Sequence, residues 1–410
     1  MPKIIRRIFG KAKRLEKTNY DIRGPLLDKA KELTKQGHEI LHLNIGNTAP
    51  FGLLPPWQMI RFLWDNIKLT FGYTESKGLT QARLAILQYY ETKNVEKLDF
   101  ENIFCGNGVS DEIAKICESF INPGDEILVN SPDYPLWSSK IIAFGGTPVY
   151  YFCDEQNEWL PDLEDLKSKI TDRTKAIVII PFNNPTGAII PKEMLLQICQ
   201  IAREHQLAIF SDEIYDKIIY DGNESISIAS LADDLLIVTL NGLSKAYRLP
   251  GWRSGWAAIS GNTEIAEGFI QGMKELHDQS LGANALGQIV IQSALGGYQS
   301  IFDLTATNGR LYRQREIGYK LLTSIPGLSC FKPKSALYFF PRIDTERFNI
   351  ISDEQFLLDF LEKHYVLLTP GKGFNWPKPD HFRMVFLPHE DDLIEAINRL
   401  GNFLSTYKQK

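Results

Sequence analysis

The middle of this chain alternates between short apolar runs and longer stretches with helical spacing, and this alternation limits the folds open to it. The strand-like runs are Glu126–Asn130, Pro148–Phe152, Ala176–Pro181, Leu207–Ser211, Leu235–Leu240 and Trp256–Ser260. Most are apolar at every position, which is typical of strands buried on both faces. Helical patterns lie between them, for instance Ser110–Phe120, with Ser110 as the expected N-cap, and Lys192–His205. The order predicts a mostly parallel α/β sheet with helices on both sides.

Polar residues follow three of these predicted strands. Asn184 lies in an Asn-Asn-Pro-Thr-Gly turn, Asp212 and Tyr215 lie in Ser-Asp-Glu-Ile-Tyr, and Ser244 and Lys245 follow the run that ends at position 240. Each group alone has an ordinary structural explanation, such as a turn, an N-cap or a ring at the edge of a core. Because ligands of parallel sheets bind outside the carboxyl ends of the strands, we expect the three groups to share one pocket.

The residue types in that pocket suit a pyridoxal phosphate cofactor. Lys245 can form a Schiff base with an aldehyde. A buried carboxylate at Asp212 would keep a pyridine nitrogen protonated, which the ring needs in order to accept electrons. Tyr215 and Asn184 are of the right type to hydrogen-bond the phenolic oxygen of the ring, which lowers the pKa of the Schiff base. Tyr134, in the loop after the first predicted strand, is expected to stack on the ring.

A glycine-rich turn upstream has the composition of a phosphate site. Residues 106–110 read Gly-Asn-Gly-Val-Ser and precede a helix. The backbone N–H groups of Gly108, Val109 and Ser110 would therefore face a phosphate, together with the positive end of the helix dipole. Arg253 and Ser244 would complete the site, because a guanidinium pairs with phosphate through two hydrogen bonds.

Composition and charge argue against several other classes of ligand. The glycine turn lacks the third glycine of a dinucleotide site, since Asp111 stands there. The net charge of −5 gives no reason to expect a nucleic-acid partner, and no apolar stretch approaches the length of a membrane span. Five scattered cysteines without a CxxC pair predict free thiols and no metal site. The basic segment Lys3–Lys17 lacks the features of a targeting sequence, so we expect a cytoplasmic protein.

A chain of 410 residues is expected to form two domains. From about Ser300 the pattern changes to a long charged helix, short strands and a final helix from Asp391, which is typical of an α+β domain. The segment before Pro55 is expected to pack on that domain. The predicted division is 1–54 as an N-terminal arm and packing segment, 55–300 as a large cofactor-binding domain and 301–410 as a small C-terminal domain.

Several motifs together resemble the class I aminotransferases, which are pyridoxal-phosphate enzymes of fold type I. They are Gly72-Tyr73-Thr74, the Asn-Asn-Pro-Thr-Gly turn, Ser-Asp-Glu-Ile-Tyr, Ser-Lys and the Gly-Trp-Arg-Ser-Gly-Trp run at 251–256. Four more stretches are similar to the bacterial glutamate–pyruvate (alanine) aminotransferases: Tyr20–Pro25, Leu43–Asn47, Ala294–Ser300 and Phe374–Pro377. The resemblance extends from about Tyr20 to the C-terminus.

The resemblance implies a mostly parallel seven-stranded sheet in the large domain and a homodimer whose sites are shared between subunits. It implies that Lys245 carries pyridoxal 5′-phosphate and that Tyr73 reaches the phosphate of the neighbouring subunit's cofactor. It also implies that Gly46, Asn184 and Arg383 bind the amino-acid substrate. A guanidinium suits an α-carboxylate because the two groups pair through parallel hydrogen bonds. The implied reaction moves an amino group between L-alanine and 2-oxoglutarate, giving pyruvate and L-glutamate.

Two departures from the family pattern leave details open. Gly242 stands where many relatives have a phosphate-binding serine, and Gln279-Ser280-Leu281-Gly282 stands where an arginine is expected. The partner for the distal carboxylate of glutamate is therefore Arg23 or Arg248, and we favour Arg23 because we expect the N-terminal segment to be flexible. Transamination of aspartate, valine or an aromatic amino acid, and a C–S β-lyase reaction, are the alternatives.

Overall fold

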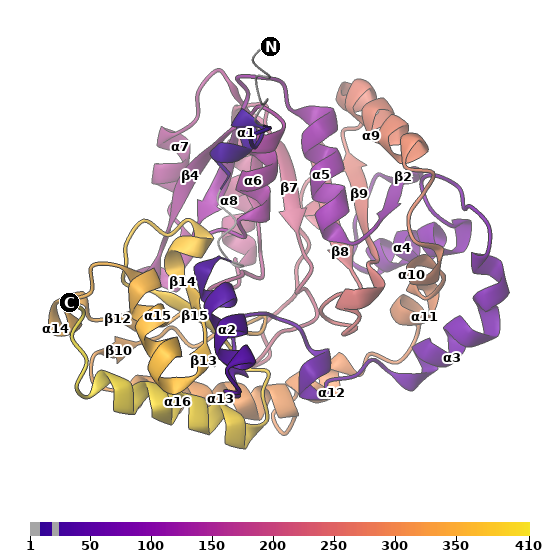
Figure 1. The fold of residues 1–410 in the computed structure, drawn as a ribbon. Helices are drawn as coiled ribbons and strands as arrows, with labels where there is room; N and C mark the ends of the chain where they lie inside the picture. The colour runs from indigo at the N-terminus through magenta and orange to yellow at the C-terminus, as the bar shows by residue number, and fades with distance from the viewer. Residues whose placement is uncertain (1–8, 19–23) are drawn as a thin grey trace, which may run out of the picture.

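A computed structural model describes residues 9–18 and 24–410. Its largest element is an eight-stranded sheet in the order β2-β9-β8-β7-β6-β3-β4-β5 (Figure 1). The strands are β2 (Leu98–Gly106), β3 (Glu126–Ser131), β4 (Thr147–Asp154), β5 (Leu160–Pro161), β6 (Thr174–Ile179), β7 (Ala208–Asp212), β8 (Leu236–Gly242) and β9 (Gly255–Gly261). Neighbouring strands pair in parallel from β4 through β8, whereas β9 and β5 pair antiparallel.

The predicted mostly parallel sheet is confirmed, with three differences in detail. Strand β2 was not found from the sequence because charged residues interrupt its first half, at Asp99 and Glu101. Strand β9 runs antiparallel to both of its neighbours, β2 and β8. It nevertheless has the continuous apolar pattern of a parallel strand, because every one of its residues is buried. The eighth strand, β5, is a two-residue edge that pairs with Cys153 and Asp154, so seven longer strands form the sheet.

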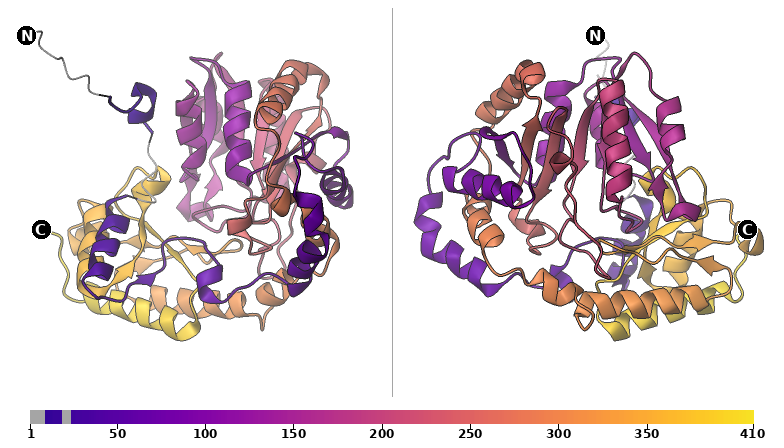
Figure 2. Two further views of the ribbon diagram at one scale, coloured as in Figure 1. Left: turned by 45° about the vertical axis from the view of Figure 1, so that its right-hand side comes forward. Right: turned by 180° about the vertical axis from the view of Figure 1, so that it is seen from behind.

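Helices cover both faces of this sheet. Helices α5 (Val109–Phe120), α6 (Leu136–Ala143) and α9 (Glu267–Gln279) pack on one face, where alternate residues such as Val129 and Val178 join their apolar cluster. Helices α4 (Thr80–Thr92) and α8 (Lys192–Glu204) pack on the other, against residues such as Leu128 and Ile177. Figure 1 shows α5 and α6 in front of the strands, and α8 is in front in the reverse view of Figure 2. Successive residues of a strand point to opposite faces of the sheet, and helices cover both faces. The strands are therefore apolar at nearly every position.

The C-terminal part forms a smaller layer of short strands and helices below the sheet (Figure 1). Its elements are β10 (Leu328–Ser329), β11 (Tyr338–Phe339), β12 (Arg342–Ile343), β13 (Val366–Leu367), β14 (Thr369–Pro370), β15 (Phe382–Val385), α13 (Arg310–Ser324), α14 (Thr345–Phe348), α15 (Asp353–His364) and α16 (Glu390–Leu404). Strand β15 is central, between β11 and β14. Helix α15 begins after Ser352, whose hydroxyl accepts a hydrogen bond from the N–H of Gln355 and so caps the helix.

The N-terminal segment joins this smaller layer. Helix α2 (Pro25–Lys35) packs on α15, and β1 (Leu41–His42) pairs in parallel with β13. The remaining helices are α1 (Lys13–Glu16), α3 (Trp57–Asn66), α7 (Leu163–Ser168), α10 (Ala285–Ile289), α11 (Ile291–Gly296) and α12 (Ile301–Thr305). Within residues 9–18 and 24–410, no helix has the length and apolarity needed to cross a membrane.

Candidate active site

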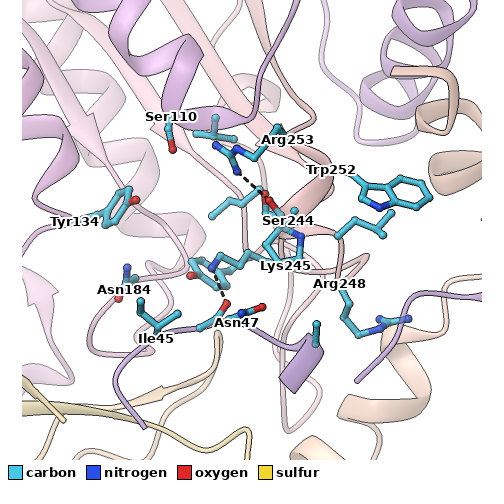
Figure 3. A pocket seen from close by; sticks show the side chains of 18 of the residues that line it. Ile45, Asn47, Ser110, Tyr134, Asn184, Ser244, Lys245, Arg248, Trp252 and Arg253 are labelled. Atoms are coloured by element: carbon cyan, nitrogen blue, oxygen red, sulfur yellow. Dashed lines mark hydrogen bonds between the residues drawn. The ribbon is translucent and has the colours of Figure 1, made fainter. Parts of the chain in front are cut away.

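A cavity of about 930 Å³ lies where the carboxyl ends of the large sheet face the smaller layer. Most of the predicted site residues line it: Gly46, Val109, Ser110, Tyr134, Asn184, Asp212, Tyr215, Ser244, Lys245, Arg253 and Arg383. In Figure 3, Ser110 and Arg253 lie at one end of the cavity, with Lys245 in the middle and Tyr134 and Asn184 along one side. The strand ends that the sequence pointed to therefore meet in one place.

Lys245 lies in the turn after β8 and extends into this cavity (Figure 3). Its Nζ donates a hydrogen bond of 3.0 Å to the carbonyl oxygen of Gly46. The same Nζ lies 5.8 Å from the ring centre of Tyr215. The amine also hydrogen-bonds the hydroxyl of Tyr338, and its position in the wall of the cavity suits a nucleophile.

Asp212 is the last residue of β7 and is 3% exposed. Its Oδ1 accepts a hydrogen bond of 3.3 Å from the N–H of Ile214. Burial raises the pKa of Asp212 to about 6, while that hydrogen bond and the charge of Lys245 act in the opposite direction. A protonated ring nitrogen in the cavity would stabilise the ionised form of this buried carboxylate.

The predicted phosphate end is built from the start of α5 and from Arg253. The helix begins at Val109 with Gly108 as its N-cap, so the expectation that Ser110 caps it is wrong. Gly108 has φ 83°, which favours glycine, and a Cβ there would lie 2.7 Å from Nη2 of Arg253. That nitrogen donates to the carbonyl of Asn107 at 3.1 Å. The result is a guanidinium beside the N-terminus of a twelve-residue helix, which is an arrangement that binds anions.

Close packing also explains why Gly242 departs from the family pattern. A Cβ at this position would lie 2.7 Å from the carbonyl oxygen of Ser254 and 2.9 Å from Cα of Gly255. Strand β8 therefore passes too close to β9 for a serine to fit without a shift of backbone. Ser244 lines the cavity two residues later.

Arg383 enters the cavity from β15 and is 3% exposed. Its Nη1 donates to Oδ1 of Asn184 at 2.8 Å, and its Nη2 donates to the carbonyl of Asn44 at 2.5 Å. Its guanidinium lies over the rings of Tyr338 and Phe374, at 4.4 and 4.5 Å. These contacts fix the plane of the guanidinium, so it can present paired N–H groups to a carboxylate.

The other predicted residues are placed differently, and of these Gly108 does not itself line the cavity but lies beside Arg253. Tyr73 does not line the cavity and is 87% exposed. Arg23 falls outside the described residues. Arg248 lines the cavity, but its guanidinium points away from Lys245 (Figure 3) and donates to the carbonyls of Leu54 and Ala246 and to the hydroxyl of Ser300.

Sequence reasoning missed Tyr338, which lines the cavity from β11. Its hydroxyl lies 2.6 Å from that of Tyr215. The residue lies in a run that was recognised as structured, but nothing in its local pattern distinguishes it from a core tyrosine. The pairing of β11 with β15, the strand that carries Arg383, brings Tyr338 to the cavity, and the local sequence gives no sign of that pairing.

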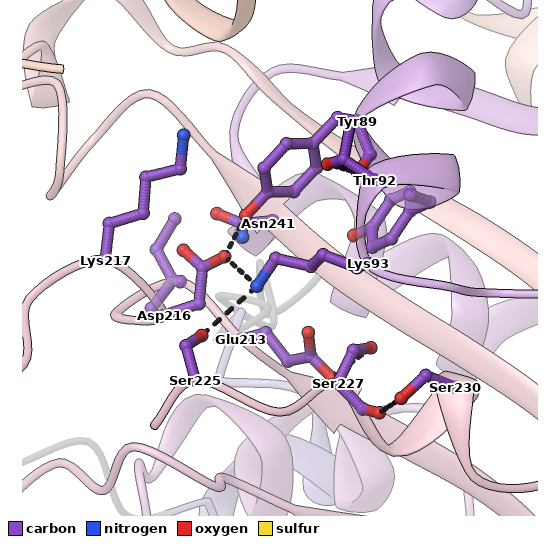
Figure 4. A network of polar contacts seen from close by, with 12 residues as sticks. Tyr89, Thr92, Lys93, Glu213, Asp216, Lys217, Ser225, Ser227, Ser230 and Asn241 are labelled. Atoms are coloured by element: carbon purple, nitrogen blue, oxygen red, sulfur yellow. Dashed lines mark hydrogen bonds and ion pairs between the residues drawn. The ribbon is translucent and has the colours of Figure 1, made fainter. Parts of the chain in front are cut away.

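A buried polar network under the β7 end was also missed (Figure 4). Lys93 forms an ion pair of 2.8 Å with Asp216, which also accepts a hydrogen bond from Tyr89. Glu213 accepts bonds from the hydroxyls of Ser211 and Ser227. Burial raises the pKa of Glu213 to about 7. The network anchors the turn that carries Asp212 and Tyr215.

The whole chain is similar to known aminotransferases. Residues 65–400 match the family "Aminotransferase class I and II". The chain is 50% identical over 399 residues to the glutamate-pyruvate aminotransferase AlaA of Escherichia coli, covering 97% of this chain and 98% of that protein. It is 49% identical over 404 residues to an alanine aminotransferase of Mycobacterium tuberculosis, covering 98% and 94%. A crystal structure of an aminotransferase from Escherichia coli has a TM-score of 0.97 at 49% identity, covering 98% of this chain and all of that one.

The chain belongs to the class I and II aminotransferases, whose cofactor is pyridoxal 5′-phosphate. The cavity fits this group on three counts that the structure itself supplies. Lys245 presents its amine to the cavity, Asp212 is a carboxylate whose pKa is raised by burial, and a side chain at Gly108 would fill the cradle beside Arg253. When bound, the cofactor withdraws electrons from the α-carbon of the substrate and so makes its proton removable.

Proposed function

We propose that this chain moves an amino group between L-alanine and 2-oxoglutarate, giving pyruvate and L-glutamate. The observation that carries the proposal is a single cavity that holds the amine of Lys245 and the fixed guanidinium of Arg383. The chain that forms it is 50% identical in sequence to a glutamate-pyruvate aminotransferase. The similarity to an enzyme named alanine aminotransferase supports the same substrate pair.

In this proposal Arg383 binds the α-carboxylate that all amino-acid substrates share. Asn184 holds the guanidinium in position through the hydrogen bond at Nη1. Gly46 leaves room beside Lys245, because a Cβ there would lie 3.3 Å from Nζ. With a substrate bound at the cofactor, Lys245 would remove the proton from the α-carbon as a general base and return a proton as a general acid.

The other predicted residues are proposed to hold the cofactor. Asp212 would pair with the ring nitrogen, and Tyr215 and Asn184 would hydrogen-bond the phenolic oxygen. Tyr134 would stack on the ring. The phosphate would be held by the N–H groups at Gly108, Val109 and Ser110 and by the side chains of Ser244 and Arg253, which lie around the start of α5 and the end of β8.

We also propose that the enzyme is a homodimer in which Tyr73 reaches the partner's cofactor phosphate. The support is a set of exposed apolar side chains from two neighbouring segments: Leu54, Trp57, Trp64, Leu69, Phe71, Leu281, Leu286, Tyr298 and Phe302. The segments contact each other through α3, η3 (Ile67–Thr70), α10 and α11. A patch of this kind marks a surface that another chain covers.

Light scattering should give twice the mass of 46.7 kDa, and Trp64→Glu should shift the protein toward monomer and weaken cofactor binding. A wild-type monomer at assay concentration would contradict this.

Arg23 is proposed to bind the distal carboxylate of glutamate. The guanidinium of Arg248 already donates to Leu54, Ala246 and Ser300, which favours Arg23 over Arg248. Arg23→Ala should therefore lower kcat/KM for glutamate far more than for alanine. Equal losses for the two substrates would eliminate the idea.

A panel of amino donors tests the proposed reaction. The purified, cofactor-loaded protein is supplied with alanine, glutamate, aspartate, valine or phenylalanine and with pyruvate or 2-oxoglutarate as acceptor. We expect the highest kcat/KM for alanine with 2-oxoglutarate and for glutamate with pyruvate. Ammonia and pyruvate released from a cysteine conjugate without any acceptor would favour the β-lyase alternative instead.

Domain division and location complete the proposal. We propose units of 1–54, 55–300 and 301–410, supported by the pairing of β1 with β13 and the packing of α2 on α15. A cytoplasmic location is supported by the cysteines, which are all free thiols and mostly buried. Limited proteolysis would test the boundaries, and cell fractionation would test the location.

A further inference from the structure

Tyr338 connects the two layers of the molecule at the centre of the cavity. It lies on β11, which pairs with β15 so that Tyr338 is opposite Val385 and Phe339 opposite Met384, next to Arg383. Tyr215, in contrast, follows β7 of the large sheet. The hydroxyl groups of Tyr338 and Tyr215 are 2.6 Å apart, which is a hydrogen bond between residues 123 positions apart in sequence.

The hydroxyl of Tyr338 occupies space that a side chain at position 46 would take. A Cβ on Gly46 would lie 2.3 Å from this hydroxyl and 3.3 Å from Nζ of Lys245. The carbonyl of Gly46 in turn accepts the hydrogen bond from Nζ. Gly46, Lys245 and the two tyrosines therefore form one group in which a side chain at position 46 would not fit.

The charges around the pair distinguish the two phenols. The titratable and charged groups that face them are Lys245 from the turn after β8, Arg383 from β15 and Tyr134 from the loop after β3. Burial opposes ionisation of Tyr338, but the charges of Lys245 and Arg383, together with hydrogen bonds to Tyr215 and Lys245, outweigh burial and lower the pKa of Tyr338. Burial and the neighbouring Tyr338 raise the pKa of Tyr215. Tyr338 is therefore the more acidic phenol and the better hydrogen-bond donor of the two.

We propose that Tyr338 is a positioning residue that acts through Tyr215: it donates its hydrogen bond to the Tyr215 oxygen, so that the Tyr215 O–H is directed at the phenolic oxygen of the cofactor. The inference rests on the proposed role of Tyr215 at that oxygen. A phenol that accepts a hydrogen bond becomes a stronger donor itself. Tyr338 thereby strengthens the bond that keeps the cofactor oxygen anionic and keeps the proton affinity of the Lys245–cofactor link low.

The pH-dependent absorbance of the bound cofactor measures this effect without any turnover. Tyr338→Phe keeps the ring that packs under Arg383 and removes only the hydroxyl. We expect the midpoint of the absorbance change to rise by about half to one pH unit, the size of one hydrogen bond. Tyr215→Phe should raise it further, and Tyr215→Phe/Tyr338→Phe should match Tyr215→Phe alone, because Tyr338 acts through that residue.

Controls separate this inference from the proposed function and from a fold defect. Tyr220→Phe removes another buried hydroxyl, which donates to the carbonyl of Ala336 outside the cavity, and should leave the midpoint unchanged. Gly46→Ala is an independent variant that displaces the Tyr338 hydroxyl and should also raise the midpoint. An unchanged midpoint in Tyr338→Phe, or additive shifts in the double variant, overturns the inference while leaving the role of Tyr215 intact. No shift in Tyr215→Phe overturns both.

Discussion

Replacement of Arg383 by lysine tests the substrate site most directly, because it keeps the charge and changes only the geometry. The guanidinium is fixed by donation to Asn184 and Asn44 and by two aromatic rings. A lysine ammonium cannot present two parallel donors in that plane. At least one charge-assisted hydrogen bond to the substrate carboxylate is then lost, which costs about 1.5–3 kcal/mol. That corresponds to a loss of about 10- to 150-fold in kcat/KM.

The assay compares alanine with an amine that lacks the carboxylate. Steady-state kcat/KM for L-alanine with 2-oxoglutarate should fall by that factor in Arg383→Lys. The slow single-turnover reaction of ethylamine with the bound cofactor should be nearly unchanged, because ethylamine has no carboxylate to lose. Arg313→Lys is the matched control, since Arg313 is exposed and pairs with Glu390 away from the cavity. Equal losses for alanine and ethylamine, or a loss of less than threefold for alanine, would refute the reasoning.

Three further predictions follow from the same geometry. Lys245→Ala should abolish transamination while pyridoxal phosphate still binds, as seen by absorbance; retained turnover would refute the lysine's role. Gly108→Ala should weaken the affinity for pyridoxal phosphate but not for phosphate-free pyridoxal, because the new Cβ meets Arg253 at 2.7 Å; equal weakening of both would place the defect elsewhere. The pKa of Asp216 is lowered in the folded state, since Lys93 and other partners outweigh its burial. Its contribution to stability is therefore present above the ordinary carboxyl pKa and lost as the pH falls below it. Lys93→Met should destabilise the protein by ~3–5 kcal/mol at neutral pH and by less in acid, measured by urea unfolding; a loss independent of pH would contradict this.

Much of the cofactor site could be predicted from local sequence. Asp212, Tyr215 and Lys245 each follow a strand that is recognisable from a short apolar run, and parallel strands bring their carboxyl ends to one edge. The phosphate turn was also visible, although its cap is Gly108 instead of Ser110. Physical chemistry then assigns the cofactor, because few ligands require a carboxylate, a phenol and an amine together.

The rest of the site depends on contacts between distant segments. The local sequence pattern did not reveal a chemical role for Tyr338 or a need for glycine at position 46. Both depend on contacts that form only where the N-terminal segment and β11 meet the large sheet. Likewise, β9 has the apolar pattern of a parallel strand, and only its position between β2 and β8 reveals the reversed direction.

The amino-acid order thus specifies which chemical groups stand at the ends of the strands, since a strand's burial and its following turn are encoded within a few residues. The packing of the smaller layer against the sheet decides which further groups complete the site, namely Arg383 from β15 and Tyr338 from β11. Contacts across hundreds of residues leave no local pattern, because they depend on the energy of the whole fold and not on that of any one segment.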